Sequence, residues 1–261
     1  GVRFLDNVVS VNKYPTKEIE KICLAHRKIG LGVMGWADML LAMNVPYSSP
    51  KALELAEELM HFIRTHAEET SEKLAKEKGA FPHYSKSSLK KRRRNATLLS
   101  IAPTGSISLI AGCSSSIEPL FGISYVREAF GGVALFESNP YFEQMGRYRG
   151  FYSTKLMHTI AEKGSVQGLK EVPKDVQALF ATALDISLET HIAMQAVFQS
   201  EVDSGVSKTI NLPQHASIGD VKRAYMLAWK KKCKGITVYR YGSKDTQVLY
   251  LGEHIGAASK S

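Results

Sequence analysis

The sequence predicts an α/β protein with a mainly parallel sheet and helices packed outside it. Four short apolar runs are typical of strands, at 97–102, 123–128, 206–212 and 236–240. Long segments with a helical spacing of apolar residues lie between these runs. Strands joined by long helical connections are expected to run in the same direction, because a parallel pair needs a crossover.

The first part of the chain is predicted to be helical over 2–12, 16–44 and 50–78. The third of these helices begins at a Ser-Pro pair, 49–50, and ends at Gly79. Within the second helix, three glycines would permit close packing against a neighbouring element: Gly30, Gly32 and Gly35.

The later helices are predicted over 152–163, 174–181, 185–200 and 218–232. For the last of them, Ser217 is the expected N-cap, with Asp220 three residues on. Its C-terminal end carries three lysines, which suit the negative end of the helix dipole. The small, polar residues of 251–261 are expected to form a flexible tail.

The amino-acid composition is that of a globular protein rather than a membrane-spanning or disulfide-rich one. The chain has 261 residues and a hydrophobic share of 44%, which is ordinary for a globular protein. No apolar run approaches ~18 residues and no signal pattern is visible, so we expect no membrane partner. Three cysteines form neither a disulfide framework nor a zinc site, which indicates a reducing, cytoplasmic location.

The net charge of +9 is concentrated in a basic run that ends with Lys90–Arg94. One interpretation is a nucleic-acid-binding module that uses this run to contact phosphates. The other is a solvated loop, which is favoured because no aromatic residues are interleaved to stack on bases. Nucleic acid is therefore not expected as a partner.

An unusual turn follows the first predicted strand. Pro103 fixes one backbone angle, and Gly105 is expected to let the chain turn where a Cβ would clash. The hydroxyls of Thr104, Ser106 and Ser108 lie next to backbone N–H groups. If this turn opens a helix, it presents converging donors to a phosphate. It matches neither the Walker motif nor G-x-G-x-x-G, so on the residues alone a purely structural turn remains open.

Four segments in consistent order carry a family resemblance. They are HRKIGLGVMGWAD at 26–38, APTGSISLIAGCSSSIEPLF at 102–121, VSKTINLP at 206–213 and CKGITVYR at 233–240. With them the chain resembles the catalytic chain of ribonucleotide reductases, specifically the adenosylcobalamin-dependent class II enzymes. The resemblance covers nearly the whole chain, and the 102–121 segment is its most specific part.

The resemblance implies a fold and a role. The family's catalytic domain is a ten-stranded α/β barrel made of two half-barrels. Residues 1–250 are then expected to form the second half-barrel with additional helices. The family binds substrate phosphates at the turn that matches five positions here: Pro103, Thr104, Gly105, Ser106 and Ile107. The complete enzyme would convert ribonucleotides to 2′-deoxyribonucleotides by thiyl-radical chemistry, with adenosylcobalamin as cofactor and an external dithiol as reductant.

The family's radical cysteine lies in an Asn-x-Cys-x-Glu motif, and this chain contains no such motif. The family's reducing cysteines also map upstream of residue 1. We therefore expect the chain to be the C-terminal part of a reductase, with the N-terminal half as partner, no catalytic residue of its own and no activity alone. A catalytically dead nucleotide-binding scaffold is a further alternative.

Other chemically active side chains are interpreted as structural. Cys23, Cys113 and Cys233 are expected to fill space, although Cys113 follows the turn closely. Three polar residues share one helix face and are expected to contact neighbouring loops rather than a metal: His191, Gln195 and Gln199. Glu118 has no visible partner for acid–base work. Tyr239 lacks the adjacent tyrosine that relays the radical in the di-iron relatives.

Overall fold

A computed structural model describes residues 1–129 and 133–243. The helices are α1 (Val2–Val11), α2 (Lys17–His26), α3 (Trp36–Ala42), α4 (Pro50–Lys78), the 3-10 turn η1 (Pro82–Lys86), α5 (Gly105–Ala111), α6 (Pro140–Arg149), α7 (Thr154–Lys163), α8 (Lys174–Leu179), α9 (Leu188–Glu201) and α10 (Ile218–Lys230). The strands are β1 (Ser124–Ala129), β2 (Val133–Ser138), β3 (Thr209–Leu212) and β4 (Thr237–Arg240).

Four extended segments lie side by side and run parallel. Single bridges join Leu31 to Leu99 and Ile101 to Val206. The chain continues from Val206 into β3, which pairs in parallel with β4. This layer confirms the predicted parallel arrangement of 97–102, 206–212 and 236–240, and it adds a segment at 29–31.

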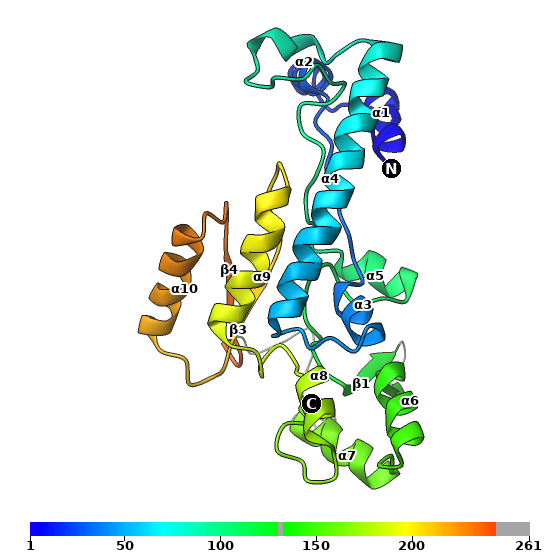
Figure 1. Cartoon of the computed structure of the whole chain (residues 1–261), viewed down its shortest axis with the longest axis vertical. Coiled ribbons are helices and arrows are strands. Elements are labelled where there is room, and N and C mark those ends of the chain that lie inside the picture. The colour runs from blue at the N-terminus through cyan, green and yellow to red at the C-terminus, as the bar shows by residue number, and fades with distance from the viewer. Residues whose placement is uncertain (130–132, 244–261) are drawn as a thin grey trace.

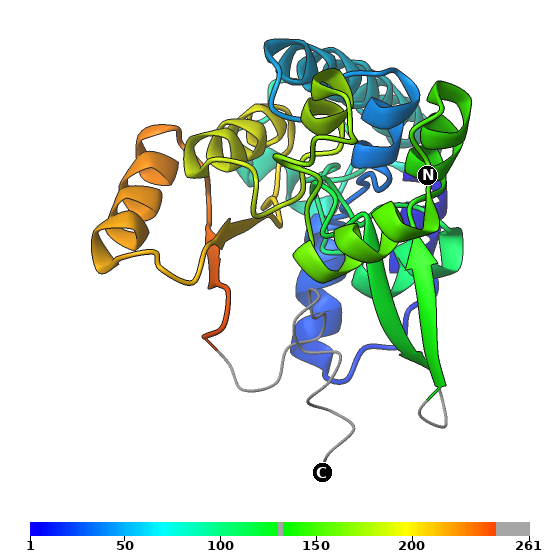
Figure 2. The ribbon, with the colours of Figure 1, turned by 90° about the horizontal axis from the view of Figure 1, so that it is seen from below.

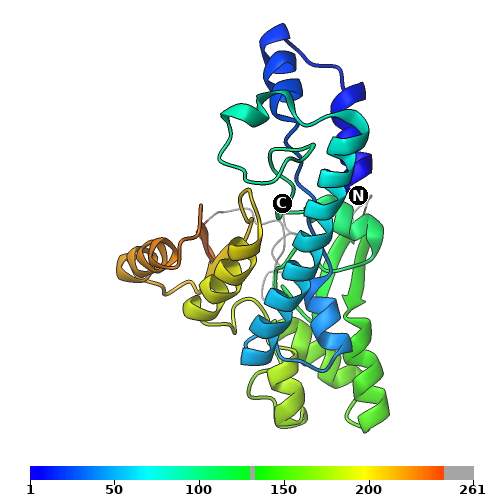
Figure 3. The same ribbon diagram turned by 45° about the horizontal axis from the view of Figure 1, so that its top comes forward.

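Helices cover this layer, as predicted for an α/β fold. The long helix α4 begins at Pro50 behind the Ser49 N-cap and ends before Gly79, as expected. Figures 1 and 3 show α4 running along the long axis of the molecule, with α9 beside it and α1 and α2 at one end. The main core lies between these elements, where the rings of Trp36 and Phe198 meet edge to face at 5.4 Å.

The prediction of one helix over 16–44 is wrong. The helix stops at His26, since Arg27 takes a left-handed conformation (φ 48°), and no further helix forms until α3 begins at Trp36. Gly32 permits the close packing that was expected of it, but between extended segments. A Cβ there would lie 2.1 Å from the backbone oxygen of Ser100, so only glycine fits.

The strand predicted at 123–128 exists, but it forms an antiparallel hairpin. β1 pairs with β2, with Val126 opposite Phe136, and Figure 2 shows the hairpin apart from the parallel layer. Neither β2 nor α6 was predicted. A second core gathers under these elements, where the rings of Phe142 and Phe180 lie 5.0 Å apart.

The end of the described chain follows the sequence prediction closely. Ser217 and Asp220 form a reciprocal capping box at the start of α10. The tail predicted at 251–261 lies outside the described residues. Within 1–129 and 133–243, we find no helix that combines the length and apolarity needed to span a bilayer.

Candidate phosphate-binding site

The predicted turn opens a helix. The parallel segment that ends at Ile101 leads through Pro103 to α5, a short helix whose first residue is Gly105. α5 ends at Gly112, which has a left-handed backbone (φ 65°). Four of the five predicted positions are exposed, and Thr104 is half-buried. The turn therefore stands at the end of a parallel segment and faces outward.

The residue that turns the chain is Thr104, so the expectation about Gly105 is wrong. Gly105 has no positive φ, and no atom outside its immediate neighbours lies within 4 Å of the place of its Cβ. Thr104 has φ 55° and ψ 23°, which is rare for a β-branched residue. Strain of this kind persists only where surrounding contacts enforce it.

Side-chain contacts enforce the conformation of Thr104. Its Oγ1 accepts a hydrogen bond from the Ser116 backbone N–H at 2.7 Å and lies 3.4 Å from the Ser115 hydroxyl. Its carbonyl accepts from the Ser108 N–H at 2.9 Å. Ser115 in turn donates to the Pro103 carbonyl at 2.6 Å. The loop at 112–118 thus holds the turn in place through these hydrogen bonds, and we call it the supporting loop.

The supporting loop is held by the N-terminus of α3. Asp38 Oδ2 accepts from the Ser114 N–H at 2.5 Å, and the Ser114 hydroxyl accepts from the Asp38 N–H at 3.3 Å. Gly35 donates its N–H to the Ser114 carbonyl at 2.7 Å. The segments at 26–38 and 102–121, which carried the resemblance separately, therefore form one structural unit.

Hydrogen-bond donors remain at the turn. In the described part of the chain, the N–H groups of Gly105, Ser106 and Ile107 have no acceptor, as expected for the first turn of a helix. The Ser106 hydroxyl is exposed and without a partner among the same residues. The turn therefore offers three N–H groups and one hydroxyl to an anion. Ser108 differs, because it is buried and its hydroxyl donates to the Gly105 carbonyl at 3.3 Å.

A buried cation lies behind the supporting loop, and the sequence interpretation missed it. Lys208 is 1% exposed, and its ammonium donates to Glu118 Oε2 at 2.5 Å. It also donates to the Thr209 carbonyl at 2.6 Å and to His191 Nδ1 at 2.9 Å. Glu118 Oε1 accepts from the Thr209 N–H at 2.7 Å. Glu118 thus has the partner that the sequence did not reveal.

The pKa values of three buried side chains around this ion pair are shifted: those of His191, Lys208 and Tyr47. Burial, with a further contribution from Lys208, lowers the pKa of His191 to about 3. Burial also lowers the pKa of Lys208, against the opposing effect of Glu118. The pKa of Tyr47 is raised by burial and by the nearby Glu118 carboxylate. At neutral pH His191 is therefore neutral and its Nδ1 can accept a hydrogen bond.

The predicted contacts of the polar face of α9 with neighbouring loops are confirmed. His191 Nε2 donates to the Ala183 carbonyl at 2.9 Å, since Nδ1 is the acceptor for Lys208. Gln195 donates to the Gly235 carbonyl at 2.7 Å. Gln199 donates to the Ser204 carbonyl at 2.9 Å. Among the described residues, no group of three or more potential metal ligands occurs.

The three cysteines are free and half-buried. Cys113 is the one closest to the turn, and its backbone N–H donates to the Ser108 carbonyl at 3.0 Å. Burial raises the pKa of the Cys233 thiol and outweighs the opposing effect of Lys231, so the pKa is not depressed as the sequence suggested.

The favoured interpretation of Lys90–Arg94 as a solvated loop is only half right. Lys90, Lys91 and Arg92 are exposed, but Arg93 and Arg94 point inward. Arg93 lies 3.4 Å from Asp203 and donates to the Ala96 carbonyl at 2.8 Å. Arg94 donates to two carbonyls at the end of α4, those of Lys78 and Gly79.

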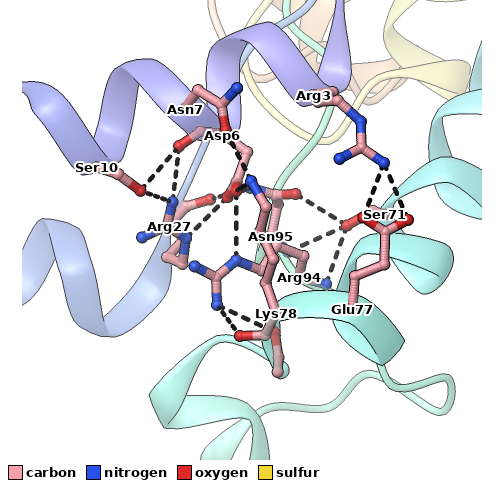
Figure 4. Close-up of polar contacts among 11 residues, drawn as sticks. Arg3, Asp6, Asn7, Ser10, Arg27, Ser71, Glu77, Lys78, Arg94 and Asn95 are labelled. Carbon is pink, nitrogen blue, oxygen red and sulfur yellow. Dashed lines mark hydrogen bonds and ion pairs between the residues drawn. The ribbon is translucent and has the colours of Figure 1, made fainter.

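Arg94 belongs to a polar cluster around Asp6 (Figure 4), which ties α1 and α2 to the end of α4. The Asp6 carboxylate is fully buried and accepts from Arg27 at 2.8 Å and from Asn95 at 3.0 Å. Burial opposes its ionisation most strongly, but Arg27, Arg94 and Asn95 together outweigh burial and lower the pKa of Asp6. This cluster explains why Arg94 is not available to an outside partner, and the contacts of Arg93 with Asp203 and Ala96 do the same for Arg93.

Residues 1–94 and 90–239 match the family model described as "Ribonucleotide reductase, barrel domain". The chain belongs to the ribonucleotide reductase family. This membership confirms the resemblance and the expected fold, a part of the reductase barrel. The "class Id ribonucleotide reductase alpha subunit" of Actinobacillus ureae superimposes with a TM-score of 0.80 at 27% identity, over 92% of this chain and 45% of that one.

The chain has a higher sequence identity to B12-dependent reductases than to this class Id subunit. The chain is 49% identical over 95% of its length to the "Vitamin B12-dependent ribonucleoside-diphosphate reductase" of Mycobacterium tuberculosis H37Rv, and 48% over 97% to that of Thermoplasma acidophilum. It is 30% identical over 95% to the "Ribonucleoside-diphosphate reductase subunit alpha" of Chlamydia pneumoniae. The chain spans about a third of the length of the B12-dependent relatives, 35% and 33% respectively.

Proposed function

We propose that this chain is the substrate-holding part of a ribonucleotide reductase that makes 2′-deoxyribonucleotides. The observation that carries the proposal is the turn at 103–107. It offers unpaired N–H groups at a helix start, within a chain 49% identical to a reductase named for ribonucleoside diphosphates. The first turn of a helix favours anions, because its N–H groups are unpaired and the dipole is positive there.

The chain's own contribution is to bind and orient the substrate. The N–H groups of Gly105, Ser106 and Ile107 and the Ser106 hydroxyl would donate to phosphate oxygens. Thr104 does not face the ligand in this proposal, because its hydroxyl already accepts from Ser116. Its role is to hold the turn in the left-handed conformation that aims these donors outward.

Adenosylcobalamin is assigned to the complete enzyme, where it would supply the radical. Two hollows in the described part of the chain are candidates for holding it. The first, beside Leu40 and Leu179, has a volume of about 10 Å³ and is too small for a corrin ring. A groove of about 440 Å³ between α4, α9 and α10 is open and bordered by lysines.

The proposed partners are those that would supply the cysteine motif that this chain lacks. The sequence has no Asn-x-Cys-x-Glu motif, and its three cysteines are free and half-buried. The remaining part of the reductase would supply the radical and reducing cysteines, and an external dithiol would reset them, in the cytoplasm. The nucleic-acid alternative loses its basis, since Arg93 and Arg94 are held inside the fold.

Two measurements test the proposal. The purified chain should bind ADP, measured by calorimetry, and Ser106→Ala should weaken binding. The loss of one hydrogen bond to a charged group costs roughly 1.5–3 kcal/mol, about ten- to a hundredfold in affinity. With adenosylcobalamin and a dithiol, the chain alone should form no deoxynucleotide. ADP binding that Ser106→Ala leaves unchanged, or turnover by the pure chain, would contradict the proposal.

A further inference from the structure

The Lys208 ammonium has all of its donors in use. Its three hydrogens match three acceptors: Glu118 Oε2, the Thr209 carbonyl and His191 Nδ1. Its side chain is completely buried, and the segment before β3 supplies it. A buried charge satisfied in this way fixes the positions of its partners, because moving any of them would leave a polar group unpaired.

Glu118 connects this cation to the supporting loop. It is the last residue of the loop, and its N–H donates to the Ser115 carbonyl at 3.0 Å. Ser115 and Ser116 are the residues that contact the turn, at the Pro103 carbonyl and at Thr104 Oγ1. A single residue, Ile117, therefore separates Glu118 of the ion pair from Ser116, which contacts Thr104.

The supporting loop has a second anchor from the helical side. The Tyr47 hydroxyl donates to the Ile117 carbonyl at 2.7 Å. The Trp36 N–H donates to the Ser116 carbonyl at 3.4 Å. These bonds hold the loop against α3 and the start of α4. Glu118, held by Lys208 and the Thr209 N–H, fastens the loop to β3.

We propose that Lys208 is a positioning residue for the phosphate turn: it fixes Glu118, and through the supporting loop it holds Thr104 and the N–H groups of 105–107 in place. The inference rests on the proposed function, and it assigns to β3 a part in substrate binding without contact to substrate. A buried ion pair often adds little net stability compared with apolar residues of similar volume, so its contribution here is to geometry.

The test compares Lys208→Met with wild type in the full 261-residue chain. Hydrogen exchange followed by mass spectrometry reports on the peptide that covers 108–118, which contains the Ser116 and Glu118 N–H groups. Calorimetry with ADP reports on the turn. We expect faster exchange in this peptide and at least a tenfold loss of ADP affinity, because Glu118 is left without its cation.

Arg27→Met is the matched control. Arg27 is also a buried cation paired with a buried carboxylate, Asp6, but it lies among α1 and α2 at the far end of α4 (Figures 1 and 4). This variant should lower the denaturation midpoint while leaving exchange at 108–118 and ADP affinity at wild-type values. A role of Lys208 in general stability alone would make the two variants behave alike.

Each outcome decides the inference. A folded Lys208→Met protein with wild-type exchange at 108–118 overturns it, and so does an Arg27→Met protein that changes 108–118 equally. If Lys208→Met does not fold, Glu118→Gln, which keeps an acceptor for Thr209, is judged by the same criteria. If wild type binds no ADP, the proposed function fails, and the exchange data alone decide whether Lys208 positions the turn.

Discussion

His191 Nδ1 lies 2.9 Å from Lys208 Nζ, and the contact requires a neutral imidazole. An imidazolium carries hydrogens on both nitrogens and would face the ammonium without an acceptor. Burial and Lys208 accordingly lower the pKa of His191 to about 3. This pair makes the folded protein sensitive to acid.

We predict that His191 causes a loss of stability below pH 6.5. The unfolded chain binds a proton at His191 near pH 6.5, whereas the folded chain does not until about pH 3. The stabilising contribution is therefore complete above pH 6.5 and is lost as pH falls through that window. Between pH 7 and pH 5 the loss from this group should be about 2 kcal/mol.

Urea unfolding at pH 7 and pH 5 measures this loss. His191→Gln removes the titrating group and should reduce the pH dependence by most of that amount, whatever its effect at pH 7. His215, an exposed histidine away from this contact, gives the matched control His215→Gln. Equal pH dependence in wild type and His191→Gln would contradict the prediction.

Thr104 should be sensitive to loss of its hydroxyl. Thr104→Val keeps the β-branched shape but leaves the Ser116 N–H, in a residue 1% exposed, without an acceptor. An unsatisfied buried donor costs roughly 1–3 kcal/mol. Thr104→Ser retains the acceptor and should remain close to wild type. Denaturant midpoints compare the two, and a stable Thr104→Val protein would show that the contact is not needed.

Gly105 should tolerate a side chain as far as folding is concerned. It lies in the first turn of α5 with no positive φ and no atom near the place of its Cβ, so Gly105→Ala should leave stability unchanged or raise it by up to about 1 kcal/mol. Gly105→Val crowds the exposed N–H groups and should weaken ADP binding. Strong destabilisation by Gly105→Ala would mean that glycine is required for the backbone.

The sequence predicted the elements whose causes are local. Ser49 and Gly79 delimit α4, and Ser217 with Asp220 opens α10, because caps act within one turn of helix. The break at Arg27 was missed, since its left-handed backbone is enforced by Asp6, a residue 21 positions away. Local propensity contains no information about such a partner.

At the candidate site, too, the sequence predicted what neighbouring residues cause and missed what distant residues cause. The sequence predicted the position of the turn at 103–107, but it did not predict that Thr104 is the residue that turns the chain. Glycine is the usual residue at such a position, and the Ser116 N–H that stabilises Thr104 is distant in sequence. Lys208 and Glu118 are 90 residues apart, so their contact could not be predicted from spacing.

Cys113 should be dispensable for chemistry. It is half-buried, and within the described part of the chain its thiol makes no hydrogen bond or ion pair, so Cys113→Ser should cost some stability through the partly buried hydroxyl and leave turnover intact. The assay is multiple turnover in the reductase reassembled with its remaining part, with Cys23→Ser for comparison. A folded Cys113→Ser enzyme that stops after one turnover would identify a redox cysteine instead.

Arg94 and Arg92 belong to one basic run but should respond differently to removal. Arg94 donates to the Lys78 and Gly79 carbonyls at the end of α4 and pairs with the buried Asp6 carboxylate. Arg94→Ala should therefore lower the free energy of unfolding by about 2 kcal/mol, less than for a broken isolated pair, because Arg27 still neutralises Asp6.

Arg92 is exposed, so Arg92→Ala should change stability by no more than about 0.5 kcal/mol. Urea unfolding of both variants measures the difference, and raised salt should affect Arg94→Ala little, since the contacts it removes are partly buried. If both variants have the same free energy of unfolding as wild type, the Asp6 cluster does not hold α4 as its geometry indicates. A loss in Arg92→Ala as large as in Arg94→Ala would assign the effect to net charge rather than to these contacts.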